Sequence, residues 1–143
     1  MPPVAPLIAM ILLVLMHFLL PGPRLVHFPI NLVGLPLLAV GVYLNLAADG
    51  SLKRYGTTVK PLEESTALVT EGVYARTRNP MYLGFVFLLL GVACLLGSTA
   101  PLLMAAAFPA LMNLMYIRAE ETMLQDRFGA EWAAYRARVR RWL

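Results

Sequence analysis

Charged residues are scarce in this chain, and long stretches contain none. Asp, Glu, Lys and Arg make up 14% of the 143 residues, whereas apolar residues make up 59%. Soluble domains contain about 25% charged residues, so this composition indicates an integral membrane protein. A chain of this length has room for one domain, and we expect a single membrane domain over residues 1–143.

Cysteine and histidine are also nearly absent, which limits the chemistry that the chain can perform. The single cysteine, Cys94, lies in an apolar run, so an internal disulfide and a cysteine-ligated metal site are excluded. The two histidines, His17 and His27, lie apart from each other and from any acid, and no metal site is expected. The glycine-rich fingerprint of dinucleotide-binding domains is missing as well.

The charges that are present fall into two regions. Of the 12 Lys and Arg residues, five lie between Asp49 and Asn79 and six lie from Arg118 onward, and all eight acids lie in the same two regions. Because bases and acids are interleaved, nucleic acid is not an expected partner, whereas the bilayer and its anionic lipid headgroups are. Basic residues mark cytoplasmic segments, so we expect both regions on the cytoplasmic side.

Four apolar stretches predict an all-α integral membrane fold with four transmembrane helices. These spans are expected at residues 4–20, 28–48, 80–97 and 100–117. Gly97 to Pro101 supply the turn of a tight hairpin between the third and fourth spans. Small residues in its arms, Gly84 and Gly91 in the first and Ala105, Ala106 and Ala107 in the second, permit a close approach of backbones. Pro36 and Pro109 are expected to kink the spans that contain them.

Two polar segments complete the expected topology: a cytoplasmic loop at 49–79 and a cytoplasmic tail helix at 118–143. In the tail, apolar residues follow spacings of four, four, three, four and three: Leu124, Phe128, Trp132, Tyr135, Val139 and Trp142. This stripe predicts an amphipathic helix lying on the membrane surface. Gly129 weakens the helix locally and can break it in two.

The start of the third span has the features of an anion site. Asn79 and Pro80 are typical of the cap and the first position of a helix. Arg78 precedes them, and the positive end of the helix dipole would face polar solvent there, which suits a carboxylate or a phosphate. The alternative is that the basic residues only anchor a membrane helix.

The start of the tail offers two carboxylates. At 100° per residue, Glu121 lies within about 20° of Phe128 and Trp132 on the apolar stripe. Glu120 lines up instead with Asn113 and Tyr116. A carboxylate here suits an ammonium, although either acid could simply be a surface charge paired with Arg118.

The aromatic rings of Tyr74 and Tyr82 are expected nearby, and aromatic faces attract cations. A ligand with a carboxylate, an ammonium and a further cation would satisfy all of these groups. S-adenosylmethionine has this set, but the residues do not select it over other zwitterions.

Three motifs carry a resemblance to a known family. The segments Gly72-x-Tyr74-x-x-x-Arg78-Asn79-Pro80-x-Tyr82-x-Gly84, Glu120-Glu121-x-x-Leu124 and Phe128-Gly129-x-x-Trp132-x-x-Tyr135-x-x-x-Val139-x-Arg141-Trp142 together resemble the isoprenylcysteine carboxyl methyltransferase family. That family belongs to a wider group of membrane methyltransferases that includes phospholipid N-methyltransferases. Asn79 stands where many members have His, and Arg140 where many have Pro.

The resemblance implies an enzyme that transfers a methyl group from S-adenosylmethionine to a lipophilic acceptor at the cytoplasmic face of a multi-pass membrane protein, the inner membrane if bacterial. It places the cofactor on Thr66, Ala67, Leu68, Val69, Tyr74, Arg78, Asn79, Pro80, Met81, Tyr82, Glu120 and Glu121. The expected reaction is direct displacement at the sulfonium methyl, with Glu121 at the site and Arg118 and Arg141 as candidates for holding an anionic acceptor. Methylation of a phospholipid amine, and a non-catalytic membrane interaction module, are the alternatives.

Overall fold

The computed structural model describes residues 4–57 and 66–143, and helices are the regular secondary structure of these segments. The bundle helices are α1 (Val4–Leu19), α2 (Gly34–Arg54), α3 (Pro80–Leu96) and α4 (Thr99–Met112), and α5 (Arg118–Arg138) follows them. Short turns of tighter or wider helix are η1 (Ile30–Val33), η2 (Gly72–Ala75) and the π-helical η3 (Asn113–Ile117), which joins α4 to α5. The all-α fold class predicted from the composition is confirmed.

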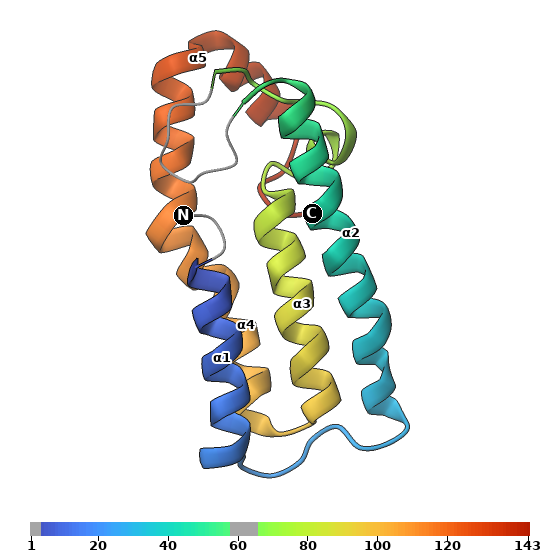
Figure 1. Cartoon of the computed structure of the whole chain (residues 1–143). Helices are drawn as coiled ribbons and strands as arrows, with labels where there is room; N and C mark the ends of the chain where they lie inside the picture. The colour runs from blue at the N-terminus through green and yellow to red at the C-terminus, as the bar shows by residue number, and fades with distance from the viewer. Residues whose placement is uncertain (1–3, 58–65) are drawn as a thin grey trace.

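Helix α3 is the centre of the bundle and contacts α1, α2 and α4 (Figure 1). The α1–α2 connection and the α3–α4 turn lie at one end, whereas α5 and the segment before α3 lie at the other. Side chains from α1, α3 and α4 form the buried core, among them Leu13, Leu89 and Phe108. The polar residues singled out in the sequence therefore gather at one end of an apolar bundle.

The helix lengths support a membrane protein. The helical stretches Ile30–Arg54 and Thr99–Arg138 are long and apolar enough to cross a bilayer, and the apolar helices α1 and α3 are shorter, with 16 and 17 residues. The 40 residues of Thr99–Arg138 would be about 60 Å long as one straight helix, roughly twice the hydrocarbon thickness. Only part of Thr99–Arg138 can therefore lie in lipid, and the charged α5 must project from it.

Backbone contacts close the end of the bundle opposite α5. Gly97, with a φ of 74°, ends α3, and its carbonyl accepts hydrogen bonds from the amides of Leu25 and Val26. A Cβ at Gly97 would lie in collision with the Val26 carbonyl oxygen, so the sharp turn requires glycine here. The buried Ser98 hydroxyl lies 2.7 Å from His17 Nδ1, which fastens α1 to the turn.

Glycines bring α2 and α3 into backbone contact. A Cβ on Gly34 would collide with the carbonyl oxygen of Gly91, and a Cβ on Gly41 would lie 2.8 Å from that of Gly84. The predicted close approach therefore exists, but its partner is α2 and not the other arm of the hairpin. Of the three alanines expected to face these glycines, Ala105 is buried, whereas Ala106 and Ala107 are exposed.

We expect Gly41→Ala to lower the thermal stability of the protein in detergent. The new methyl group would press on the α3 backbone, which cannot move aside as a side chain could, and overpacking of this kind costs about 1–3 kcal/mol. Gly50→Ala is the matched control on the same helix, because a Cβ there meets nothing within 4 Å and alanine favours helix. Equal melting temperatures for the two variants would contradict the close contact.

The prolines and the tail differ from expectation. Pro36 lies in the first turn of α2 rather than inside the helix, where amides have no intrahelical partner in any case, so a kink in the middle of this span has no basis. The helical run continues past Pro109, and α geometry gives way four residues later, at η3. The tail helix ends at Arg138, and Val139 is extended.

The apolar stripe of the tail packs against protein instead of facing lipid. Trp132, Tyr135 and Val139 form a buried cluster to which Leu68, Leu124 and Phe128 add. Leu68 comes from the segment before α3, so this segment covers the face that was expected to lie on the membrane. The predicted break at Gly129 is confirmed, because its φ of 49° and ψ of −114° are not helical.

Candidate functional site

The candidate site lies where three segments meet at the polar end of the bundle: the start of α3, the start of α5 and the extended residues after Val139. Arg78 precedes α3, Glu121 belongs to the first turn of α5, and Arg141 belongs to the extended segment. In the sequence Arg78 and Glu121 are separated by the whole hairpin. The turn at Gly97 and Ser98 returns the chain to the same end, which brings these groups together (Figure 1).

Glu121 is held between two arginines. Arg141 Nε and Nη2 donate to its two carboxylate oxygens over 3.0 Å and 2.5 Å, a bidentate pair. Arg78 Nη1 lies 3.1 Å from Oε1 as an ion pair, and the side chains of Arg78 and Glu121 are only 9% and 12% exposed. Arg141 Nη1 donates in addition to the amide oxygen of Asn113. Both carboxylate oxygens of Glu121 are thus occupied, and Glu121 holds Arg78 and Arg141 in place.

Arg78 retains hydrogen-bonding capacity despite this ion pair. Its Nε and Nη1 make no hydrogen bond of good geometry in the described part of the chain, and the same holds for Trp132 Nε1. The Arg78 guanidinium lies 5.6 Å from the centre of the Trp132 ring. Buried donors without acceptors are costly, so this pair of side chains forms a place where an anionic group would be stabilised.

The pKa values of the two arginines are shifted in opposite directions. Burial lowers the pKa of Arg78, and the Glu121 carboxylate opposes that effect. Hydrogen bonding to Glu121 raises the pKa of Arg141. Both remain cations at neutral pH, because the ordinary pKa of arginine is far above it. The two arginines together therefore carry one more charge than Glu121 neutralises.

Glu120 has a different environment from its neighbour. Its Oε1 accepts a hydrogen bond of 2.9 Å from the hydroxyl of Tyr82, whose ring stacks on that of Tyr116 at 6.4 Å. Within residues 4–57 and 66–143, no cationic side chain forms an ion pair with Glu120. Glu120 therefore offers a carboxylate bordered by aromatic rings to an incoming cation.

The π-helical turn η3 decides which residues share a face. An α-helix would align Asn113 with Glu120, seven residues later, as the projection of the sequence assumed. The wider turn at Asn113–Ile117 adds one residue, and Asn113 instead shares Arg141 with Glu121, eight residues later. Tyr116 stays on the side of Glu120. The predicted alignment of Glu120 with Tyr116 is thus confirmed, whereas that with Asn113 is wrong because of the extra residue in η3.

The C-terminal segment is tied to the residues before α3. The Arg78 amide donates to the Arg140 carbonyl over 2.9 Å, and the side chains of Thr77 and Asn79 donate to the Arg141 carbonyl over 3.1 Å and 2.9 Å. Asn79 stands at the predicted helix cap, but its side chain does not cap the helix. The side-chain amide of Asn79 donates instead to the C-terminal segment. The backbone amides at the start of α3 therefore have no capping bond from Asn79.

The predicted cofactor segment before α3 lies partly at this site. Thr66 is exposed, whereas Val69 is buried and Leu68 packs on the tail cluster. The carbonyl of Tyr74, in η2, accepts a hydrogen bond of 2.7 Å from the Tyr135 hydroxyl, and burial raises the pKa of Tyr74 well above its usual value. The Tyr74 side chain is therefore a neutral, half-buried aromatic ring at neutral pH.

The other predicted residues differ in exposure. Pro80 is buried, Ala67 and Met81 are half-buried, and Arg118 is exposed. Arg118 forms no ion pair with Glu120 or Glu121 among the described residues, so the alternative of a simple pair at the helix exit is not observed. Sequence reasoning missed Asn113 as a site residue and treated Trp132 only as an apolar one, since neither the π turn nor an unpaired indole N–H has a local signal.

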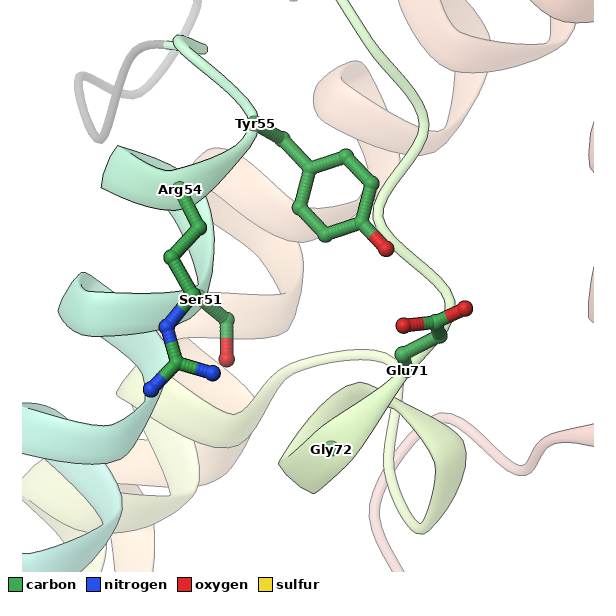
Figure 2. Close-up of a pocket in the computed structure, with 5 residues that line it drawn as sticks. All are labelled: Ser51, Arg54, Tyr55, Glu71 and Gly72. Carbon is green, nitrogen blue, oxygen red and sulfur yellow. The ribbon is translucent and has the colours of Figure 1, made fainter.

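A second feature lies on the other side of η2. A pocket of about 300 Å³ is lined by Ser51, Arg54, Tyr55, Glu71 and Gly72. Figure 2 shows that Arg54 and Tyr55 come from the end of α2, and Glu71 and Gly72 from the segment that faces it. The Tyr55 hydroxyl points toward Glu71, and the interaction with that carboxylate raises the pKa of Tyr55.

Comparison with known proteins adds independent information. A family model described as phospholipid methyltransferase matches residues 30–131. A Haemophilus influenzae protein described as uncharacterized is 38% identical over 63 residues, which are 44% of this chain and 100% of that protein. Protein-S-isoprenylcysteine O-methyltransferase of Schizosaccharomyces pombe is 36% identical over 72 residues, which are 50% of this chain and 30% of the yeast protein.

Proposed function

Since the chain belongs to the phospholipid methyltransferase family, we propose that it is a membrane enzyme that transfers the methyl group of S-adenosylmethionine to a lipophilic acceptor at the cytoplasmic membrane surface. The resemblance seen in the motifs agrees with the family match and with the name of the yeast relative. The observation that carries the proposal is the convergence of Arg78, Glu120, Glu121 and Tyr82 at one end of the bundle.

The groups at this end fit the amino-acid portion of the cofactor. Its carboxylate would accept hydrogen bonds from the buried donors of Arg78 and Trp132 that lack acceptors. Its ammonium would pair with Glu120, which forms no ion pair with another described residue. Glu121 would hold Arg78 and Arg141 in place rather than bind the ammonium itself. When bound, S-adenosylmethionine supplies a sulfonium methyl group that a nucleophile can attack directly.

The residues of this chain contribute position and exclusion of water. Tyr82 and its stacking partner Tyr116 place aromatic surface beside Glu120, and aromatic faces attract cations. The C-terminal segment, tied to Thr77 and Asn79, covers the start of α3. Holding the reactants in a dry, fixed arrangement supplies a large share of the acceleration in such transfers.

Two classes of acceptor remain, because the family model describes phospholipid methylation and the yeast relative is named for a prenylated cysteine. Arg141 favours an acceptor with an anionic group, since it is a cation held at the site and 34% exposed. A lipophilic acceptor would reach the site from the bilayer. Pro36 gives no support for a lateral gap, since it lies in the first turn of α2.

We expect labelled S-adenosylmethionine to transfer its methyl group to lipid in membrane extracts containing the protein. The acceptor is then compared as a matched pair, the same headgroup with and without its long chain, at a fixed concentration. The long-chain member should turn over on the order of 100-fold faster, because partitioning concentrates it at the site. Equal turnover of the chain-free member would contradict access of the acceptor from the bilayer. If no lipid were labelled, the proposed methyl transfer to a lipophilic acceptor would be wrong.

The orientation proposed is four crossings by α1 to α4, with α5 and both termini in the cytoplasm. It rests on the distribution of basic residues in the sequence, where 11 of the 12 fall in two regions, five between Asp49 and Asn79 and six from Arg118 onward. Helices α1 and α3 are slightly short, and a locally thinner bilayer accommodates such lengths at modest cost.

Cysteine labelling in intact cells checks this orientation. In a Cys94→Ala background, Leu25→Cys and Ala130→Cys introduce thiols at exposed positions at opposite ends of the molecule. A membrane-impermeant maleimide should label Leu25→Cys only from outside and Ala130→Cys only after permeabilisation. Labelling of both positions from the same side would contradict an odd number of crossings between them.

A further inference from the structure

Asn113 places a carboxamide at the end of an apolar span. Helix α4 contains no charged residue, and the neighbours Leu114 and Met115 are exposed where lipid would surround the bundle. A side-chain amide beside lipid-facing residues is costly unless it is hydrogen-bonded. Its Oδ1 atom lies 3.0 Å from Arg141 Nη1, 28 residues later in the chain. This bond joins the end of the membrane bundle to the C-terminal segment that carries Arg141.

The chemistry of Arg141 fixes the orientation of the Asn113 side chain. A guanidinium can only donate hydrogen bonds, so the amide must face it with its oxygen and not with its nitrogen. The π-helical turn η3 makes the contact possible, because its extra residue places Asn113 on the side of Glu121. Asn113 and Glu121 therefore hold the same guanidinium group.

Arg141 keeps donors for a ligand in this arrangement. A guanidinium carries five N–H groups. In Arg141 the Nε–H and one N–H of Nη2 bind Glu121, and one N–H of Nη1 binds Asn113. Each terminal nitrogen is left with one N–H that has no acceptor among the described residues, and the side chain is 34% exposed. Two neighbouring N–H groups of this kind suit two oxygens of a carboxylate or a phosphate.

Glu121 and Asn113 hold the guanidinium in different ways. Glu121 fixes one edge of it and contributes a negative charge, whereas Asn113 fixes the other terminal nitrogen and is neutral. A neutral acceptor orients Arg141 without reducing its attraction for an anion. The carboxamide at position 113 is therefore suited to an arginine that must be rigid and still bind a negative group.

We propose that Asn113 is a positioning residue for the methyl acceptor: it orients Arg141 so that the two remaining N–H groups receive the anionic group of the acceptor, a carboxylate or a phosphate. The inference rests on the proposed function, since it names the group of the acceptor that Arg141 holds. Asn113 acts through Arg141, whereas the groups that fit the cofactor belong to Arg78, Trp132 and Glu120. Its loss should therefore affect the acceptor and leave S-adenosylmethionine binding unchanged.

The test compares Asn113→Ala with Leu114→Ala, two truncations in the same π turn. Leu114 is the matched control, because it is 64% exposed and lies outside the site. Calorimetric titration in detergent micelles measures the binding of phosphatidylethanolamine, of an S-prenylated cysteine with a free carboxylate, and of the methyl ester of that cysteine. Asn113→Ala should weaken an anionic probe about tenfold, and Leu114→Ala should weaken none. Asn113→Leu, which removes the acceptor and keeps a large side chain, should behave as Asn113→Ala does.

The probes distinguish the two sources of the anion. Weakening of the prenylated cysteine alone assigns the contact to a carboxylate, and weakening of phosphatidylethanolamine alone assigns it to a phosphate. The methyl ester has no anionic group and should bind equally well to the unaltered chain and to Asn113→Ala. In steady-state methyl transfer, the KM for the acceptor should rise by the same factor as the dissociation constant, with kcat unchanged.

A second comparison in an Arg141→Gln background tests whether Asn113 acts through Arg141. Asn113→Ala should cause no further loss there, because the residue that it orients is gone. An equal loss in both backgrounds would overturn the proposal, and so would unchanged binding of both anionic probes by a folded Asn113→Ala. Weaker binding of the methyl ester or of S-adenosylmethionine in Asn113→Ala would assign Asn113 to the fold instead. Absence of methyl transfer by the unaltered chain would contradict the proposed function, whereas the binding measurements test Asn113 without turnover.

Discussion

Glu121→Gln is expected to abolish measurable methyl transfer and to lower the melting temperature of the protein. The substitution leaves Arg78, whose side chain is 9% exposed, without its carboxylate, and it releases the bidentate partner of Arg141. Breaking a buried ion pair by removing one partner costs about 3–5 kcal/mol. We expect a fall in transfer rate of at least about 100-fold, measured with labelled S-adenosylmethionine, because Arg78 and Arg141, the cations of the site, lose the carboxylate that holds them in place.

Glu131→Gln is the control for this variant, because Glu131 lies on the same helix and is exposed. It should retain the activity and the melting temperature of the unaltered chain. Circular dichroism and gel filtration separate a folded, inactive Glu121→Gln from an unfolded one. A folded variant with full activity would show that the Arg78–Glu121–Arg141 cluster has no part in the reaction.

Glu120→Gln should instead weaken cofactor binding with little change in stability. The Arg78–Glu121–Arg141 cluster stays intact, and the glutamine can still accept the hydrogen bond from Tyr82. Only the charge that faces an ammonium is lost. Hydrogen bonds to charged groups contribute about 1.5–3 kcal/mol, so the dissociation constant of S-adenosylmethionine should rise about 10- to 150-fold, as measured by calorimetric titration.

Tyr82→Phe provides the comparison that identifies the cause. It keeps the aromatic ring against Tyr116 and the Glu120 charge, and removes only the hydroxyl that orients the carboxylate. Its effect on affinity should be smaller than that of Glu120→Gln. Equal affinity of Glu120→Gln and the unaltered chain would move the ammonium site away from Glu120. A fall in melting temperature as large as that of Glu121→Gln would assign Glu120 a structural role.

The sequence by itself determined the class of molecule and the two segments that carry its charged residues. Apolar stretches separated by Pro21–Pro23 and Gly97–Pro101, with charges confined to two regions, are sufficient for a helical membrane protein with one polar end. The motifs around Arg78, Glu120 and Arg141 supplied the family, which the family match supports over residues 30–131. These features are local, since they depend on composition and on spacing within one segment.

Tertiary structure decided which charges meet, because such contacts depend on register and on distant segments. The extra residue in η3 moved Asn113 to the side of Glu121, and the break at Gly129 together with the end of α5 at Arg138 returned Arg141 to a carboxylate 20 residues earlier. A uniform projection at 100° per residue cannot contain either event. The partner of the α3 glycines was likewise settled by packing, since small residues permit close approach without specifying which helix approaches.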